Sequence, residues 1–113
     1  MYQRKFPRQY YCPLDYAGAL LCGKWKTRII CELGHCNHLR YGELKVKIQD
    51  VSDAALADSL KELQQAGIIN RKQFNEMPIR VEYSLTSEGK RLLPIFIQIT
   101  SWSVDNSQID DYK

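Results

Sequence analysis

Apolar residues follow two different spacings along the chain, and the change between them separates the predicted elements. From residue 13 to residue 67 they recur every three or four positions, which is the spacing of one face of an α-helix. Between residues 79 and 85 they recur at every second position, as in a half-buried strand. The helical spacing then returns and continues to residue 104. This order predicts several helices, one β-hairpin and a closing helix.

The chain begins with a basic, aromatic arm and a short helix. Residues 1–12 show neither spacing, so we expect an arm there. Pro13 suits the first turn of a helix, because an N–H group at that position would have no intrahelical partner. We expect this helix to run to about Leu21 and Gly23 to break it.

A second helix is predicted from Trp25, Ile29 and Leu33, which recur at every fourth position. We expect Gly34 to end it, because glycine is common just past the C-terminus of a helix. Residues 35–39 are then expected to form a loop.

Two further short helices are joined by a turn at residues 49–51. Ser52 is a favoured N-cap for the fourth helix, and Gly67 suits its C-terminal cap. The apolar stripes are Tyr41, Leu44 and Ile48 in the third helix and Leu56, Leu60 and Leu63 in the fourth. Two short helices separated by about three residues form a helix-turn-helix.

The hairpin follows directly. Ile79, Val81, Tyr83 and Leu85 alternate with polar residues and predict one strand, with residues 68–74 as its partner. Residues 75–78 are expected to be the loop, because Pro78 lacks the N–H group that a strand ladder needs. A hairpin in this position is a wing, and the predicted fold is therefore a mainly helical α+β winged helix-turn-helix.

Thr86 can cap a last helix that holds more apolar surface than one face can bury. Pro94 removes an intrahelical hydrogen bond, so we expect a bend or a restart there. The main stripe is Leu92, Ile95, Phe96, Ile99 and Trp102, flanked by Leu93, Ile97 and Val104.

Length and composition indicate one soluble globular domain. The chain has 113 residues, of which 44% are hydrophobic and 26% charged. We expect the domain at 13–106 and a polar tail at 107–113. The longest apolar stretch, residues 17–22, is far shorter than the roughly 20 residues that a bilayer requires, and no signal-peptide core follows the N-terminus. These features predict a cytoplasmic protein with no membrane partner.

Charge is distributed unevenly along the chain. Residues 1–47 carry nine Lys and Arg against three acidic residues, whereas the remainder carries seven against ten. This asymmetry is compatible with one surface that meets a polyanion.

The cysteines are predicted to be free thiols, because a reducing compartment makes a disulfide framework unfavourable. Cys22 falls on the core face of the second helix, Cys31 lies off that face, and only Cys36 is expected to be exposed. His35 and His38 add two possible metal ligands, but the spacing lacks the paired knuckle of structural zinc sites, so no metal is expected.

The sequence also argues against an enzyme. It has no C-x-x-C pair and no glycine-rich phosphate loop, and its two histidines share one short segment. We therefore expect no catalytic residue and no cofactor.

Four motifs in order resemble the HxlR-type family of bacterial winged helix-turn-helix transcription regulators. They are Cys12-Pro13, the Gly-Lys-Trp-Lys of residues 23–26, the Leu-Lys-Glu-Leu of residues 60–63 with Gly-Ile-Ile at 67–69, and residues 78–86. The similarity runs from about Cys12 to Trp102.

The resemblance implies a homodimer joined through the N- and C-terminal helices, with each subunit's recognition helix in a major groove. A pseudo-palindromic double-stranded DNA operator is the expected partner. The surplus apolar surface of the last helix supports a partner subunit, although it could instead be buried within the protomer against Tyr16, Leu20 and Leu21. The predicted interface residues are Tyr16, Leu20, Leu92, Ile95, Phe96, Ile99 and Trp102.

DNA would be held by basic residues and read by the start of the fourth helix. The phosphate contacts are predicted to be Arg40, Lys45, Arg71, Lys72 and Arg80, with Arg80 foremost, although such residues can also serve solubility alone. The reading surface is predicted to be Ser52, Asp53, Ala54, Ala55, Ala57 and Asp58, together with Lys61.

This reading surface departs from the family, whose members commonly carry Gln, Lys or Arg there. An aspartate can accept a hydrogen bond from cytosine N4 and an alanine can touch a thymine methyl group. Asp53 could instead stabilise the first turn of its helix through the helix dipole.

Cys12 matches a cysteine that several family members use to sense oxidants or electrophiles, and Lys24 and Lys26 are expected near it. It could instead be a small apolar residue at the dimer contact. Two further alternatives stay open: a winged-helix module that binds protein, and a regulator that responds to a non-redox small ligand.

Overall fold

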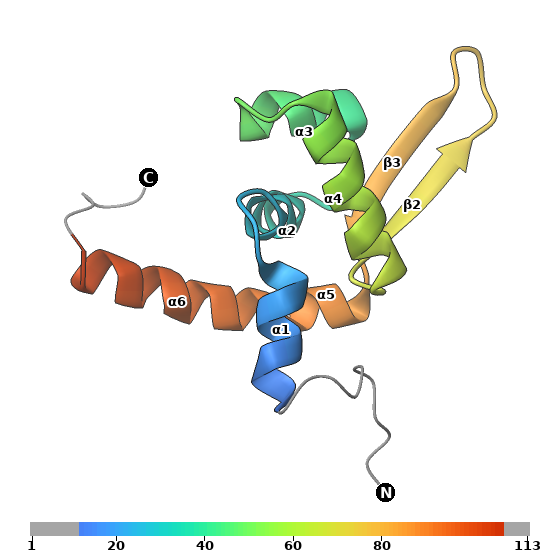
Figure 1. Cartoon of the computed structure of the whole chain (residues 1–113). Coiled ribbons are helices and arrows are strands. Elements are labelled where there is room, and N and C mark those ends of the chain that lie inside the picture. Colours follow the sequence, from blue (N-terminus) through green and yellow to red (C-terminus); the bar gives the residue numbers. More distant parts are fainter. Residues whose placement is uncertain (1–11, 108–113) are drawn as a thin grey trace, which may run out of the picture.

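The computed structural model describes residues 12–107, which fold into six helices and a three-stranded sheet (Figure 1). In chain order these are α1 (Pro13–Leu21), α2 (Lys26–His35), β1 (Leu39–Arg40), α3 (Tyr41–Ile48), α4 (Asp53–Gln65), β2 (Ile69–Phe74), β3 (Arg80–Leu85), α5 (Ser87–Arg91) and α6 (Leu93–Asp105). The predicted mainly helical winged helix-turn-helix is confirmed. The predicted arm at 1–12 lies almost entirely outside the described residues, as does most of the tail.

The core lies where α2, α3 and α4 meet the sheet. The apolar stripes predicted from periodicity supply most of it, since Ile29, Leu33, Leu44, Ile48, Leu56, Leu60 and Leu63 are all buried. Tyr83 and Leu85 close it from β3, and Phe96 closes it from α6. Within residues 12–107, no helix is both long enough and apolar enough to cross a membrane.

The sheet has the antiparallel order β1-β3-β2. The expected loop at 35–39 is wrong at its end, because Leu39 pairs with Tyr83 and starts β1. A strand of two residues has no internal period, so only its partner reveals it. The prediction of Ile79 as an inward strand position is also wrong, since β3 begins at Arg80 and Ile79 is exposed in the wing loop.

Gly34 does not end α2, which continues to His35. The glycine instead allows a close helix approach, because a Cβ at this position would lie 2.7 Å from Leu93 Cδ2. The side chain of Leu93 on α6 therefore packs where a larger residue would stand. Packing between α2 and α6, not capping, explains this glycine.

Caps and turns at the helix-turn-helix follow the predictions. The Ser52 hydroxyl accepts a hydrogen bond from the N–H of Ala55 at 3.0 Å and caps α4. Gln49 and Asp50 have φ values of 57° and 55°, so two consecutive left-handed residues reverse the chain between α3 and α4. Gly67, with φ at 78°, lies just past the C-terminus of α4 as expected.

The C-terminal segment is two helices, not one. Thr86 caps α5 by accepting from the N–H of Gly89 at 3.0 Å, and Leu92 separates α5 from α6. The restart predicted near Pro94 is confirmed, with the proline in the first turn of α6. Figure 1 shows α6 extending beyond α1 at one end of the molecule, while α3, the start of α4 and the tip of the wing lie at the other.

Candidate nucleic-acid interface

The side of α4 that is turned away from the core is exposed, and the start of this helix lies at the same end of the molecule as the tip of the wing (Figure 1). Its apolar face is turned into the core, so the opposite side chains are left on the surface. These are Asp53, Ala54, Ala57, Asp58 and Lys61, all of which the sequence placed on a reading surface. Within residues 12–107, the side chains of Asp58 and Lys61 form no hydrogen bond or ion pair.

Asp53, in contrast, is held by two side chains from α3. Its Oδ1 atom lies 2.7 Å from Lys45 Nζ and accepts a hydrogen bond from the Tyr41 hydroxyl at 3.1 Å. The hydrogen bond from Lys45, and then that from Tyr41, lowers the pKa of the Asp53 carboxyl below its usual range. Partial burial, and then the same carboxylate, raises the pKa of Tyr41. The sequence singled out Lys45 and Asp53 separately but not their contact, and it placed Tyr41 only in the apolar stripe of its helix.

The solvent side of the sheet carries a row of charges across all three strands. Arg40 on β1 and Lys72 on β2 both lie opposite Glu82 on β3, so the three side chains share one face. His38 Nε2 is 3.6 Å from Glu82 Oε2. Within residues 12–107 the guanidinium of Arg40 forms no ion pair, and the residue is exposed.

Arg80, the foremost predicted phosphate contact, is already engaged within the protein. Its guanidinium lies 3.5 Å from Glu76 and 3.5 Å from Glu82, and 4.0 Å from the centre of the Phe74 ring. Lys72 Nζ lies 4.9 Å from the centre of the same ring. Cation–π contacts at exposed sites each contribute about 0.5–1 kcal/mol of attraction. Sequence inspection missed Phe74, whose position opposite Arg80 only the strand register reveals.

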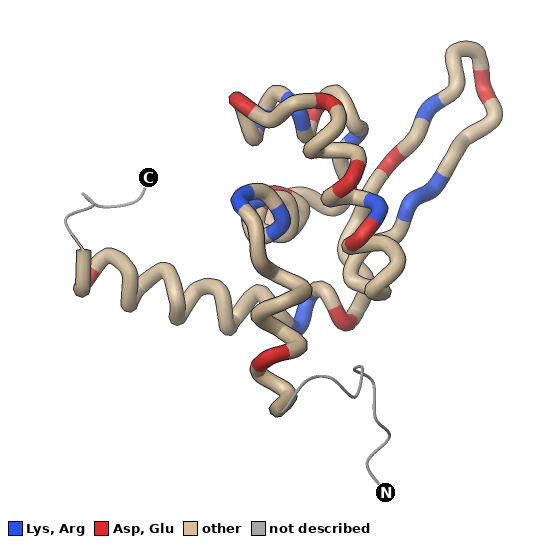
Figure 2. Tube along the Cα trace, viewed as in Figure 1, with Lys and Arg blue, Asp and Glu red and all other residues tan. Residues whose placement is uncertain are grey.

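Basic residues are thus distributed over α3 and both strands of the wing, whereas α6 carries none (Figure 2). Arg71 lies on the other face of the hairpin, opposite Tyr83, and is exposed; among the described residues its guanidinium donates one hydrogen bond, to Gln73 at 3.5 Å. Of the five predicted phosphate contacts, Lys45 and Arg80 are paired with carboxylates. The remaining three, Arg40, Arg71 and Lys72, are free of carboxylates within the described residues.

The four cysteines are free, but two of them are not placed as predicted. Cys22 is exposed, not in the core, because α1 ends before it and its thiol donates to the carbonyl of Ala19. Cys36 is half-buried against the core, not exposed. Cys31 is also half-buried, and burial raises the pKa of its thiol. Within the described part of the chain, no three side chains are placed to hold a metal ion.

Cys12 is exposed at the N-cap of α1, where its N–H donates to the Asp15 carboxylate at 3.3 Å. The two lysines expected near it are engaged elsewhere. Lys24 lies over the Trp25 ring at 4.9 Å, and Lys26 is buried with its ammonium paired to Glu62 of α4. Neither of these two lysines is therefore available to stabilise a Cys12 thiolate.

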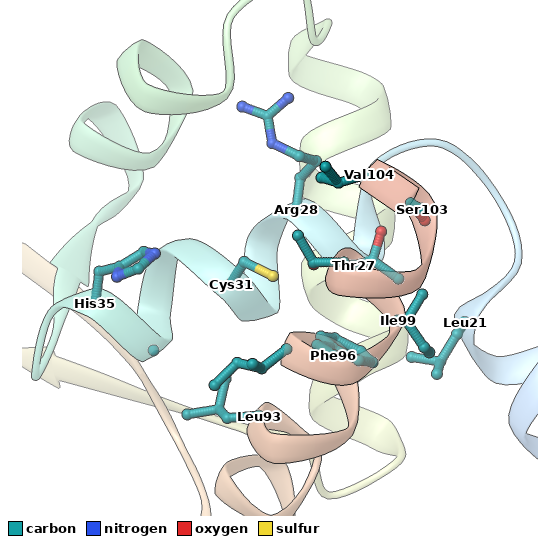
Figure 3. Close-up of a pocket in the computed structure, with 13 residues that line it drawn as sticks. Leu21, Thr27, Arg28, Cys31, His35, Leu93, Phe96, Ile99, Ser103 and Val104 are labelled. Atoms are coloured by element: carbon teal, nitrogen blue, oxygen red, sulfur yellow. The ribbon is translucent and has the colours of Figure 1, made fainter. Parts of the chain in front are cut away.

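Helix α6 contributes to two apolar surfaces. A groove of about 770 Å³ runs between α2 and α6, with Leu93, Phe96 and Ile99 on one side and Cys31 on the other (Figure 3). Ile95 and Trp102, seven residues apart, share a different face of α6 and are 52% and 65% exposed. Phe96 is buried within the protomer, so little of it is left for a partner.

Comparisons with known proteins agree on one family. A family model described as HxlR-like helix-turn-helix matches residues 20–111. The chain is 39% identical over 97 residues to the HTH-type transcriptional regulator YdzF of Bacillus subtilis. The matched stretch covers 86% of this chain and 89% of YdzF. A solved MarR-family transcriptional regulator from Porphyromonas gingivalis W83 superposes with a TM-score of 0.80 at 39% identity, over 92% of this chain and all of that one.

The reduced form of the transcriptional regulator YodB from B. subtilis superposes with a TM-score of 0.78 at 32% identity. The match covers 90% of this chain and all of the YodB chain. YodB has also been solved after diamide treatment and with a bound quinone.

Proposed function

The chain belongs to the HxlR-like helix-turn-helix family and is a transcriptional regulator, and we propose that it acts as a homodimer that binds a pseudo-palindromic double-stranded DNA operator. The observation that carries this proposal is the arrangement of two surfaces at opposite ends of the protomer. The outward face of α4 lies beside the wing at one end, and the uncovered apolar helix α6 lies at the other (Figure 1). The relatives of this chain are named as regulators, which argues against an enzymatic function.

Phosphate contacts are assigned first to the cations without carboxylate partners. Arg40 and Lys72 share the solvent face of the sheet, and Arg71 projects from the opposite face of the same hairpin. A wing that approaches a DNA backbone would present these side chains to phosphates. We expect a smaller contribution from Arg80, because Glu76 and Glu82 already neutralise it.

Base reading is assigned to the exposed side chains of α4. Asp58 has no partner among the described residues, so its carboxylate is free to accept a hydrogen bond from cytosine N4. Ala54 and Ala57 offer methyl groups for contact with thymine. In a selection of bound sites from a random DNA pool, Asp58→Ala should change the preferred base at one position of each half-site. An unchanged preference would remove Asp58 from the reading surface.

DNA binding itself is tested by the salt dependence of the affinity. Each lost phosphate contact should lower the slope of log K against log salt by about 0.9. We expect Lys72→Ala to lower the slope by this amount per subunit, and Lys90→Ala, on exposed α5, to leave it unchanged. A wild-type protein without any salt-dependent binding to duplex DNA would contradict the proposal and favour a module that binds protein.

The regulation we propose is a modification of the Cys12 thiol: either oxidation with a second thiol to a disulfide, in which an oxidant such as diamide takes up the two electrons and two protons, or alkylation by an electrophile. Its thiol is exposed, and the residue is the N-cap of α1, one of the two helices assigned to the proposed dimer interface. The diamide-treated and quinone-bound structures of YodB support thiol chemistry in a similar fold. A modified residue at the start of α1 would change the packing of that helix and, through it, the spacing of the two α4 helices.

A further inference from the structure

Two donors from α3 meet at one carboxylate oxygen of α4. Asp53 is the first residue of α4, and its Oδ1 atom lies within hydrogen-bonding distance of Lys45 Nζ at 2.7 Å and of the Tyr41 hydroxyl at 3.1 Å. Tyr41 and Lys45 are four residues apart, so they project from one face of α3. The carboxylate therefore occupies the point at which two donors of α3 converge.

This contact is open to solvent, so the fold does not require it to satisfy buried groups. The Asp53 side chain is 72% exposed and that of Lys45 is 41% exposed. Exposed ion pairs of this kind contribute little to stability and are easily exchanged for another partner. The position also matters, because the proposed DNA-reading face begins at the same residue.

We propose that Asp53 is an internal competitor for a phosphate-binding pair formed by Tyr41 and Lys45. An ammonium and a hydroxyl that converge on one anionic oxygen are the donors that proteins use to hold a DNA phosphate. In the free protein the Asp53 carboxylate fills that place. The inference rests on the proposed DNA-binding function and deepens it, because it identifies a residue that lowers affinity for every DNA sequence alike.

Simple repulsion is the rival explanation, since any acidic residue near DNA lowers affinity. Asp58 provides the comparison, because it is exposed on the same helix and has no partner among the described residues. Repulsion by Asp53 would act whether or not Lys45 is present. A competitor, in contrast, acts only through Lys45 and Tyr41, so its effect must couple to theirs.

A double-mutant cycle on the full chain separates the two. Affinity for a labelled generic duplex is measured by fluorescence anisotropy at several salt concentrations. The proteins are the wild type, Lys45→Ala, Asp53→Asn, Asp58→Asn and the two double variants that combine Lys45→Ala with either asparagine. Circular dichroism and thermal unfolding establish that each variant is folded.

We expect Lys45→Ala to weaken binding by less than about twofold in the wild type and by at least about fivefold in the Asp53→Asn background, because coupling between contacting residues commonly reaches this size. Asp53→Asn should also steepen the salt slope by about 0.9 per subunit, as a released lysine gains a phosphate. In the Asp58→Asn background the effect of Lys45→Ala should equal that in the wild type. Tyr41→Phe should follow the pattern of Lys45→Ala.

Equal effects of Lys45→Ala in all three backgrounds would overturn the competitor and leave repulsion alone. That result leaves the DNA-binding function intact, since the wild type would still bind. A wild type without salt-dependent binding would instead overturn the proposed function, and the competitor with it.

Discussion

The ammonium group of Lys26 at the start of α2 is buried, and its partner is the Glu62 carboxylate on α4. Leu20 and Tyr16 of α1 lie beside the same pair. The ion pair thus joins α2 to the proposed DNA-reading helix α4, beside two residues of the proposed dimerisation helix α1.

Removing the carboxylate should destabilise the protein. In Glu62→Ala the buried ammonium of Lys26 loses its partner, and breaking a fully buried pair costs about 3–5 kcal/mol. Glu62 is 57% exposed, so water can replace part of the interaction. We therefore expect a smaller loss, about 1.5–3 kcal/mol in the free energy of unfolding, which is the usual contribution of a hydrogen bond to a charged group. Urea denaturation measures it, and Gln64→Ala, on the exposed side of α4, should change it little.

Gly89 should not tolerate a side chain. A Cβ there would lie 2.3 Å from the carbonyl oxygen of Ile68, which is backbone and cannot move aside. Overpacking of this kind costs about 1–3 kcal/mol, so Gly89→Ala should lower the midpoint of thermal unfolding. Gly18→Ala is the matched control, because a Cβ on this residue of α1 meets nothing within 4 Å. It should stabilise the protein by up to about 1 kcal/mol through helix propensity.

The exposed face of α6 should decide the oligomeric state. Trp102 is 65% exposed in the protomer, so Trp102→Glu leaves the core intact while placing a charge in the proposed interface. We expect light scattering coupled to gel filtration to report a dimer for the wild type and a monomer for this variant. Val46→Glu changes a residue on α3 that is 75% exposed and should remain dimeric. A dimeric Trp102→Glu protein would place the interface elsewhere.

Cys12 should control the response to oxidants. Diamide is expected to release the wild-type protein from its operator and to leave Cys12→Ser bound. Cys22→Ser is the matched control, since Cys22 is also exposed but lies at the other end of α1. Its response should equal that of the wild type. Release of Cys12→Ser by diamide would assign sensing to a different thiol.

The titration of Asp53 tests the geometry of its contacts without DNA. Lys45 and Tyr41 lower the pKa of the Asp53 carboxyl, so its charge should persist to a lower pH than that of an ordinary aspartate. The stability that these contacts add is present above the unfolded-state pKa and is lost as the pH falls through the lower folded-state pKa. Carbon-detected NMR follows the carboxyl group directly. In Lys45→Ala the midpoint should move up towards the ordinary value.

Local signals in the sequence predicted the elements well. Ser52, Thr86 and Gly67 act within one turn of their own helix, so their roles can be derived without knowledge of the fold. The apolar stripes of α2, α3 and α4 predicted the core for the same reason, because one buried face sets the period of a helix.

Features that depend on distant partners could not be predicted in this way. The strand at Leu39 exists only through its pairing with Tyr83, and Gly34 is explained only by Leu93 on another helix. Cys22 is exposed because the helix whose core face it was assigned to begins only at Lys26, and Cys36 is half-buried because it packs against a core that distant elements form. The contact between Lys45 and Asp53 depends on the left-handed turn between α3 and α4, for which neither Gln49 nor Asp50 gives a strong signal.

The two faces of α4 carry separate duties, and this has a consequence for how regulators of this type can diverge. The buried side chains of Leu56, Leu60 and Leu63 pack in the core and hold the helix in place. Ala57 and Asp58 are exposed and do not pack in the core. Mutations on the outward face can therefore accumulate after gene duplication without loss of a stable protein. A laboratory library randomised at 54, 57 and 58 should yield folded proteins with new operator preferences, and the same freedom is open to natural selection.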